Sequence, residues 1–146
     1  MRYGIFAALV LAAALVTSCE DEVGMTSLPR GTDLQIDLLY LPDGVDDSEV
    51  FTVAWEVLNV GTEDSPATSV FIDVYDLDWN WHKGYSLSDV PALYPGEVLY
   101  DYAGMKIRND VPVAGTFFVV VTVDPYDLVV ELSEYNNHSA GIVKAW

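Results

Sequence analysis

Hydrophobic and polar residues alternate along much of the chain after residue 33, with the period of two that is typical of β-strands. The segment 51–57 reads FTVAWEV and the segment 69–75 reads SVFIDVY, so each puts large apolar side chains on one face. Trp55 falls in phase with Val53 and Val57, and we expect it in the core. The segment 117–123, FFVVVTV, is suited to a central strand. No stretch has the spacing of an amphipathic helix, so the pattern predicts an all-β fold.

Turn residues divide these segments into short strands. Pro95-Gly96 marks a tight reversal, and Asp124-Pro125 ends the longest apolar run because proline cannot donate to a strand ladder. The spacing indicates an immunoglobulin-like antiparallel β-sandwich of about seven strands. The acidic segment 43–49 is expected to be a solvated loop between the first two strands. The expected strands span 33–41, 49–59, 68–76, 82–88, 96–102, 115–124 and 138–145.

The first 18 residues have the features of a bacterial secretory signal. Arg2 precedes an apolar run from Ile5 to Val16, which is too short to span a bilayer, since a spanning helix needs about 20 apolar residues. Val16-Thr17-Ser18-Cys19 resembles the lipobox of bacterial lipoproteins, in which the cysteine thiol receives a diacylglycerol before cleavage. We predict a lipoprotein signal peptide over 1–18 and a lipid on Cys19. An ordinary signal peptide with an incidental cysteine is the alternative.

Residues 19–32 are predicted to be a flexible tether, with a reach of at most about 40 Å when extended. The acidic residues 20–22 resemble the signal that sends some lipoproteins to the cell surface in certain phyla, and they are equally typical of a solvated linker. We expect the protein at the bacterial cell envelope, in the outer membrane or at the cell surface rather than in the inner membrane. Residues 33–146 form the predicted sandwich domain.

Composition narrows the classes of partner. The 146 residues suit one domain, and 6 basic against 23 acidic residues give a net charge of −17. That charge excludes electrostatic binding to nucleic acid, because such binding needs Lys and Arg to replace counterions. A mean hydropathy of +0.24 and 12% aromatic residues argue against disorder.

The residues near the C-terminus carry a resemblance to a known family. Their types and spacing are similar to the terminal signature of CARDB, a family of bacterial cell-adhesion-related domains with an immunoglobulin-like sandwich. Asn59-Val60-Gly61 and the segments 33–36, 93–97 and 115–117 also fit that family in order, whereas 76–85 and 105–111 depart from it. The signature residues are Asp124, Pro125, Val129, Glu131, Glu134, Asn136 and Asn137.

Two roles are open for this C-terminal signature. Glu131, Glu134, Asn136 and Asn137 have side chains that can pair with backbone groups left unpaired at a crossover, which is a structural role. Carboxylates and amide carbonyls within one loop are also hard oxygen ligands for calcium. We favour the structural role, because the loop lacks the Asp-x-Asp spacing and glycine of a preorganised calcium loop.

The segment 73–85 holds the candidate binding residues. Trp79, Trp81 and Tyr85 are suited to contact a partner, because aromatic rings stack on sugars and dominate interface energetics. Capping the sandwich or packing across a hairpin is their alternative role. Nearby, Asp73, Asp76 and Asp78 are candidate cation ligands, or simply an exposed strand end in an acidic chain.

Catalysis finds little support in the sequence. Only His82 and His138 are available as near-neutral bases, no serine lies in a nucleophile-elbow context, and no Cys/His cluster has zinc spacing. We expect a protein that is no enzyme and has no cofactor, with calcium as the open possibility. The leading hypothesis is a lipid-anchored interaction or adhesion module that binds envelope protein or polysaccharide. The alternatives are a cation-dependent glycan-binding domain and a structural subunit of an envelope assembly.

Overall fold

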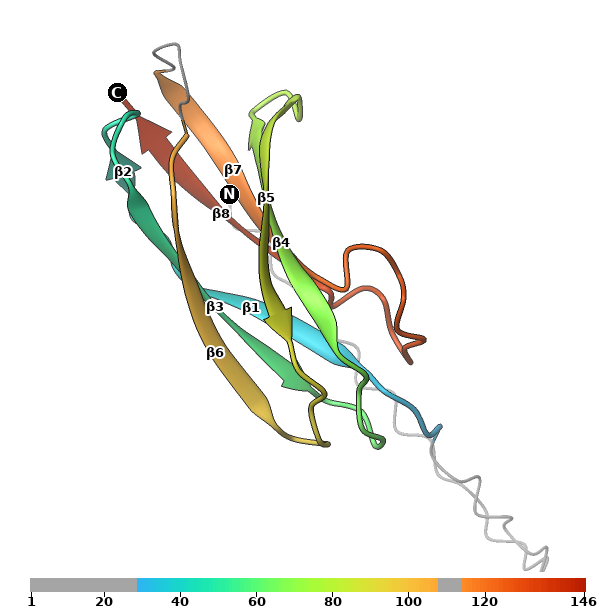
Figure 1. Ribbon diagram of the computed structural model, residues 1–146. Helices are drawn as coiled ribbons and strands as arrows, with labels where there is room; N and C mark the ends of the chain where they lie inside the picture. Colours follow the sequence, from blue (N-terminus) through green and yellow to red (C-terminus); the bar gives the residue numbers. More distant parts are fainter. Residues whose placement is uncertain (1–28, 108–113) are drawn as a thin grey trace, which may run out of the picture.

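The chain folds into strands joined by turns and loops. A computed structural model describes residues 29–107 and 114–146, and within these ranges it contains eight strands and no helix (Figure 1). The prediction of an all-β sandwich is confirmed, and seven strands lie where the alternation predicted them. The strands are β1 (Leu34–Tyr40), β2 (Gly44–Val45), β3 (Phe51–Asn59), β4 (Thr68–Asp76), β5 (Trp81–Val90), β6 (Val98–Met105), β7 (Gly115–Val123) and β8 (His138–Ala145).

Two sheets face each other across a single core. One has three strands in the order β1-β3-β6, and the other has five in the order β2-β8-β7-β4-β5. Neighbouring strands are antiparallel except for β2 and β8, which run parallel. This is the layered arrangement of an immunoglobulin-like sandwich, in which the inner faces of both sheets supply the core.

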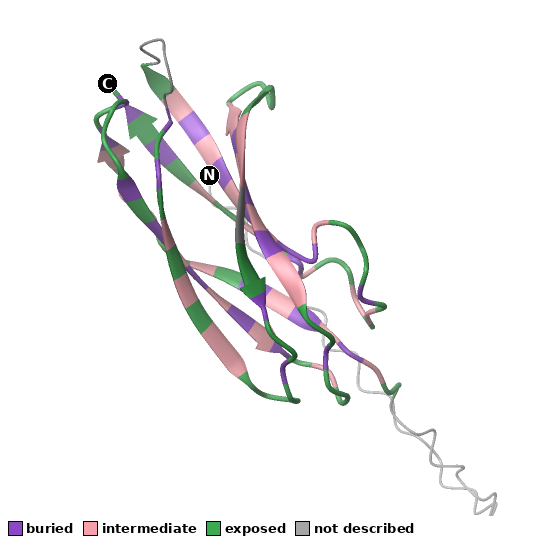
Figure 2. Ribbon diagram, viewed as in Figure 1, coloured by how far each residue is buried: buried purple, intermediate pink, exposed green. Residues whose placement is uncertain are grey.

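The core follows the alternation seen in the sequence. Along β3 and β7 every second side chain is buried, and Figure 2 shows buried residues alternating mostly with residues of intermediate burial. Trp55, the largest of the fully buried side chains, is 1% exposed between Val53 and Val57, which are fully buried. The predicted face of this strand is confirmed. Because the buried residues are β-branched or aromatic, the strands that carry them also have high intrinsic β propensity.

The expectation of a solvated loop over 43–49 is wrong in part. Gly44 and Val45 form β2, which pairs with Lys144 and Ala145 at the end of β8. Val45 and Asp47 are buried, so this segment closes one edge of the five-stranded sheet. A two-residue strand is too short to show an alternation, and its partner lies about a hundred residues away, so no local pattern could reveal it.

The sandwich has two distinct ends (Figure 1). At the hairpin end, where β4 turns into β5, Asp76 lies opposite Phe117, and Phe117 lies opposite Val143. At the other end, which we call the Thr32 end, Thr32 bridges to Glu131 in the loop between β7 and β8. The N-terminal chain therefore enters the domain at the end opposite to the β4–β5 hairpin.

Backbone contacts fix the chain at the Thr32 end. The N–H of Thr62 donates to the carbonyl of Gly31 at 2.8 Å, and the N–H of Leu132 donates to the carbonyl of Thr32 at 2.9 Å. Gly61 is required for the first contact, because a Cβ there would lie 2.4 Å from the carbonyl oxygen of Gly31. Residues 31 and 32 are thus held by backbone contacts to the loops that follow β3 and β7.

Candidate binding surface and C-terminal loop

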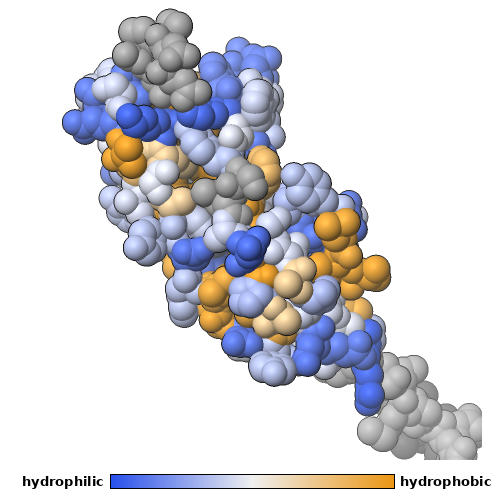
Figure 3. Space-filling view, viewed as in Figure 1, coloured by the Kyte–Doolittle hydropathy of each residue, from blue (hydrophilic) through white to orange (hydrophobic). Residues whose placement is uncertain are grey.

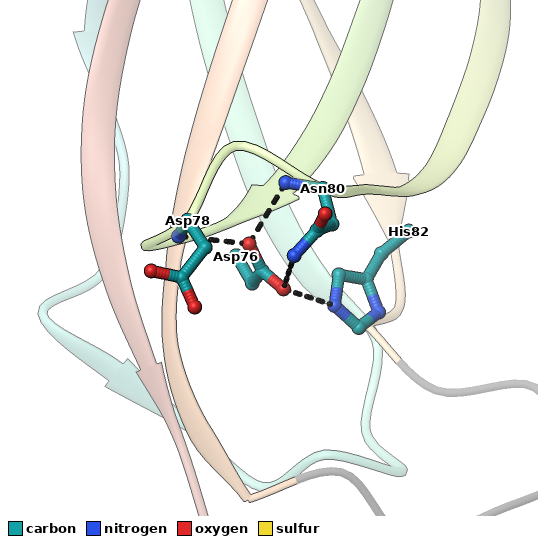
Figure 4. Close-up of polar contacts among 4 residues, drawn as sticks. All are labelled: Asp76, Asp78, Asn80 and His82. Carbon is teal, nitrogen blue, oxygen red and sulfur yellow. Dashed lines mark hydrogen bonds and ion pairs between the residues drawn. The ribbon is translucent and has the colours of Figure 1, made fainter.

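The β4–β5 hairpin is closed by the carboxylate of Asp76 (Figure 4). One of its oxygens accepts hydrogen bonds from the backbone N–H groups of Asp78 at 2.9 Å and Asn80 at 2.8 Å. The other accepts from the side-chain amide of Asn80 at 2.8 Å and lies 3.6 Å from Nε2 of His82. These contacts lower the pKa of Asp76, with the Asn80 amide as the largest cause. The carboxylate therefore acts as the organising group of the turn.

This turn places Trp79 on the outer face of the five-stranded sheet. Trp79 has a φ of 61°, a left-handed conformation that is uncommon for a bulky residue. Its indole stacks on Phe118 with ring centroids 4.7 Å apart and an angle of 9° between the planes. It also lies 5.7 Å from the ring of Tyr75. The side chain is nevertheless 60% exposed, so one broad face of the ring remains open to a partner.

Trp81 lies on the same outer face of the sheet. It pairs with Tyr75 across β4 and β5, and its indole N–H donates to the carboxylate of Asp73 at 2.9 Å. The ring is 62% exposed and passes over Gly84, where a Cβ would meet both the ring and the Asp73 carboxylate. We call Tyr75, Trp79, Trp81 and Phe118 the aromatic platform. Burial, with a smaller contribution from Asp73, raises the pKa of Tyr75 and favours its neutral form.

Tyr85 is not part of this platform. It lies opposite Ile72, which is fully buried, and it packs against the core. Its hydroxyl donates a hydrogen bond to the carbonyl of Lys106, and the ammonium group of Lys83 lies 4.5 Å from the centre of its ring. Of the three aromatic residues singled out in the sequence, only Trp79 and Trp81 lie on the outer face of this sheet.

The C-terminal signature begins with a buried aspartate. β7 ends at Val123, immediately before Asp124 and Pro125. Asp124 is buried with a φ of 47°. Its carboxylate accepts from the hydroxyl of Thr68 at 2.8 Å and from the backbone N–H of Val129 at 2.8 Å. The side chain therefore ties the β7–β8 loop to the start of β4.

The other signature residues bind the same loop to β1. Glu131 accepts from the backbone N–H of Leu34 at 2.5 Å and from the amide of Asn137 at 3.2 Å. The amide of Asn137 also donates to Glu134 at 2.8 Å, and that of Asn136 donates to Asp33 at 2.9 Å. Each of these contacts stays within the domain.

Burial has the largest effect on the pKa of Glu131. It raises the pKa of the carboxyl to about 7, and the hydrogen bond from Leu34 opposes this increase only in part. Glu134 and Asp124 add like charge nearby, which raises the pKa further. Glu131 is thus a carboxylate held in a setting that favours its protonated form.

Apolar side chains are exposed on the tip of the same loop. Leu128, Val130 and Tyr135 all point largely into solvent, whereas Val129 between them is buried. Figure 3 shows the hydrophobic surface over this loop. The Val129 anchor explains how the loop keeps its shape while its neighbours remain exposed.

The predicted lipid site lies outside this description. Cys19 and the signal segment 1–18 precede the described residues, as does most of the tether. Among residues 29–107 and 114–146, no helix is long and apolar enough to cross a membrane.

Comparison with known families decides the classification. The family model CARDB matches residues 31–141. The chain belongs to the CARDB family. This confirms the resemblance drawn from the C-terminal signature, and it shows that the segments 76–85 and 105–111 lie within a domain of this family.

Solved structures show the same fold. The CARDB domain of a Pyrococcus furiosus protein, solved in complex with di-metal ions, is 24% identical with a TM-score of 0.58, and the match covers 82% of this chain and 97% of that chain. A β-glucosidase of Listeria innocua, solved with laminaribiose, is 12% identical with a TM-score of 0.55, and the match covers 79% of this chain and 16% of the enzyme. No curated protein matches the chain. At these identities the likeness shows the fold alone.

The di-metal complex of the Pyrococcus furiosus CARDB domain raises the question of a cation site here. In this CARDB domain both oxygens of Asp76 accept N–H groups, and Asp73 accepts the indole N–H of Trp81. In the part of the chain that the structure describes, no three His, Cys, Asp or Glu side chains are grouped to hold a metal. The carboxylates of Asp73 and Asp76 therefore serve as hairpin contacts in this arrangement, whereas Asp78 contributes its backbone N–H.

Two members of the aromatic platform were missed in the sequence. The sequence predicted Phe118 only as part of an apolar central strand and Tyr75 only as an outward-facing strand residue, and the phase of both opposes that of the buried residues 117, 119, 72 and 74. That phase was the available signal, because side chains two residues apart share a face. What the phase could not reveal is that the turn brings Trp79 onto Phe118.

Proposed function

We propose that this CARDB domain is a non-catalytic interaction module, anchored at the cell envelope through a lipid on Cys19, that binds polysaccharide or protein through the aromatic platform. The platform offers two exposed indoles, of which that of Trp79 is supported by the ring of Phe118 and that of Trp81 is held by Asp73. Such rings bury a large area at a small cost in side-chain entropy, which is why they dominate interface energetics. Their flat faces also suit the apolar C–H faces of sugars.

One observation carries this proposal. Trp79 adopts a left-handed backbone conformation and still remains 60% exposed. A conformation of this kind costs about 1–3 kcal/mol and persists only where its surroundings enforce it. Here the Asp76 carboxylate enforces it through the N–H groups of residues 78 and 80. The hairpin thus holds an indole on the surface at a cost in stability, which favours a role in recognition.

The position of the platform also supports the proposal. It lies at the hairpin end, whereas Thr32 enters at the other end (Figure 1). The nine residues of β7 span about 30 Å between these ends. A domain anchored through its N-terminal segment would therefore present the platform away from the membrane.

The placement of the histidines agrees with a role in binding alone. His82 lies beside Asp76 at the hairpin end, and His138 begins β8 opposite Thr122 at the other end. The two candidate bases are thus separated by the length of the sandwich. Between the two partner classes, exposed indoles favour polysaccharide, because sugar rings can lie flat on them.

A sedimentation assay with insoluble envelope polysaccharide tests this function. The protein should bind, and a double variant Trp79→Ala/Trp81→Ala should lose binding. Tyr100→Ala/Tyr102→Ala is the matched control, because it removes two exposed aromatic rings from the other sheet. If the tyrosine variant lost binding and the tryptophan variant retained it, the binding site would lie on the three-stranded sheet, and the proposal would be wrong.

Two further measurements separate the alternatives. Cross-linking to envelope proteins, with no binding to polysaccharide, would identify a protein partner for the same platform. Repeating the sedimentation with EDTA and then with calcium tests the cation-dependent alternative, which requires binding to fall with EDTA and to recover with calcium. Our proposal expects no change.

A further inference from the structure

The loop between β7 and β8, residues 124–137, exposes apolar side chains that the aromatic platform does not use, and we call it the apolar loop. Val130 is 90% exposed and Tyr135 is 93% exposed, and Leu128 and Leu132 are exposed as well. The loop projects from the body of the sandwich (Figure 1), and hydrophobic surface covers it (Figure 3). One exposed apolar residue needs no explanation, whereas several in one loop mark a contact with a membrane or another molecule.

Contacts within the domain hold the apolar loop in shape. Val129 is buried, and its backbone N–H donates to the carboxylate of Asp124 at 2.8 Å. At the end of the loop, the carbonyl of Asn136 accepts from the N–H of Ile36 at 3.1 Å. The exposed side chains are thus presented by a fixed backbone. Covering them with another surface would therefore cost little ordering of the chain.

The apolar loop lies where the N-terminal chain enters the domain. The N–H of Leu132 donates to the carbonyl of Thr32, and a Cβ on Gly31 would lie 3.0 Å from Cδ2 of Leu132. The predicted lipid on Cys19 stands a short segment before Gly31, so the two are at most about 40 Å apart even in a fully extended chain. A lipid anchor would therefore keep this loop close to the bilayer surface, at the high effective concentration that a short tether provides.

The charges of the apolar loop restrict the kind of surface that can cover it. Its sequence, DPYDLVVELSEYNN, has four acidic residues and no basic residue. An anionic membrane would repel these acids, and a second copy of a chain with a net charge of −17 would bring like charges together. Lipid headgroups without net charge avoid both penalties. Tyr135 suits such a boundary, because a tyrosine ring is apolar while its hydroxyl can stay in water.

We propose that the apolar loop docks on a bilayer with zwitterionic headgroups, with Leu128, Val130 and Tyr135 entering the headgroup region. This inference rests on the proposed lipid anchor, because a few apolar side chains alone give only weak membrane binding. The anchor holds the domain at the membrane, and the apolar loop sets its orientation. The aromatic platform, at the hairpin end, then faces away from the bilayer.

The full lipidated chain in phosphatidylcholine nanodiscs, with one chain per disc, tests this inference. We would follow the methyl signals of Leu and Val residues by NMR while adding a water-soluble gadolinium chelate, which broadens the signals of groups that water reaches. Leu128 and Val130 should be protected. Leu77, an exposed leucine in the turn after β4, should be broadened. Mass spectrometry of the same sample shows whether Cys19 carries lipid.

Variants assign the protection to the apolar loop. Val130→Ser/Tyr135→Ser removes two side chains that are almost fully exposed, so the core stays intact. The ratio of docked to free domain should fall by about tenfold or more, in line with the apolar area removed, and Leu128 should become accessible. Leu77→Ser is the matched control and should leave Leu128 protected. Discs of phosphatidylglycerol should protect Leu128 less at low salt, because the acidic loop is repelled.

The outcomes separate the docking from the anchor and from the platform. In a lipidated sample, Leu128 as accessible as Leu77 would overturn the docking and leave the anchor in place. Protection that is unchanged in Val130→Ser/Tyr135→Ser, or that arises only with several chains per disc, would also overturn it, and the second result would assign the loop to a contact between copies. A sample without lipid on Cys19 would overturn both anchor and docking. Protected Leu128 in a protein that does not bind polysaccharide would overturn the platform alone.

Discussion

The indole of Trp79 lies nearly parallel to the ring of Phe118, at 4.7 Å between ring centroids, although the two residues are almost forty positions apart. The turn after β4 carries Trp79, and the central strand β7 carries Phe118. Phe118 thus supports one face of the indole and leaves the other face exposed. The exposed tryptophan is therefore orientated by a residue that need not touch the partner itself.

Phe118→Ala should weaken binding of the partner while both tryptophans remain in place. Aromatic stacking contributes about 0.5–1.5 kcal/mol beyond area burial, so we expect a loss of about threefold to tenfold in affinity. The sedimentation assay measures this loss. Val120→Ala, on the same outer face of β7, is the control and should bind like the native protein. An unchanged affinity for Phe118→Ala would mean that Trp79 needs no support.

Trp55→Ala should lower the free energy of unfolding by about 3–5 kcal/mol, because it empties the largest space in the core. Denaturant unfolding measures this change. Trp81→Ala removes an indole of the same size from the surface and should cost much less. Similar losses for both variants would contradict the division between core and platform.

The sandwich could be predicted because apolar and polar residues alternate along each strand, and this alternation is visible in consecutive residues. Trp55 shows this well, since the residues on each side of it already fix its face. Tyr85 shows the limit. It follows Trp81 by only four residues, yet the pairing with Ile72 directs it towards the core. Pairing between strands depends on register, and a register set by distant residues and by bulges cannot be derived from one strand alone.

Asn137→Ala should lower the free energy of unfolding by about 1–3 kcal/mol. Its amide donates to both Glu131 and Glu134, so the substitution leaves two carboxylates close together without their shared donor. Thermal or denaturant unfolding measures the loss. Tyr135→Ala is the control, since that side chain is 93% exposed in the same loop. Binding by the folded Asn137→Ala protein should be unchanged, and a selective loss of binding would place the partner site in this loop.

The stability of the domain should depend on pH through Glu131. Its pKa is about 7 in the folded state against an ordinary value of 4.5, so the folded state binds the proton more tightly. This contribution to stability is fully present below about pH 4.5 and is lost as the pH rises through 7. After allowing for partial exposure, we expect about 1–2 kcal/mol.

Glu131→Gln tests this prediction, because glutamine keeps the size of the side chain and cannot titrate. Unfolding of both proteins should be followed between pH 4.5 and 8. The difference in unfolding free energy between native protein and variant should change across this range. A constant difference would show that Glu131 does not titrate there. The comparison also cancels the general effect of the other acidic residues.

Cys19→Ala should abolish attachment of lipid and leave the precursor uncleaved, because the thiol is the acceptor in the predicted lipobox. Metabolic labelling with a fatty acid measures this. Ser18→Thr, a small change beside the cysteine, is a control that should retain some label. Label that persists in Cys19→Ala would refute the lipoprotein prediction.

The attachment of the first described residues bears on how the domain responds to mechanical load. Thr32 and Asp33 accept hydrogen bonds from Leu132 and Val60, and β1 then runs antiparallel along β3. If the chain is anchored through its N-terminus and a partner is held at the hairpin end, tension enters at residue 32 and runs along β1. Hydrogen bonds perpendicular to that direction are sheared together and do not open one by one. The strand next to the anchor is thus the one best placed to resist being pulled out.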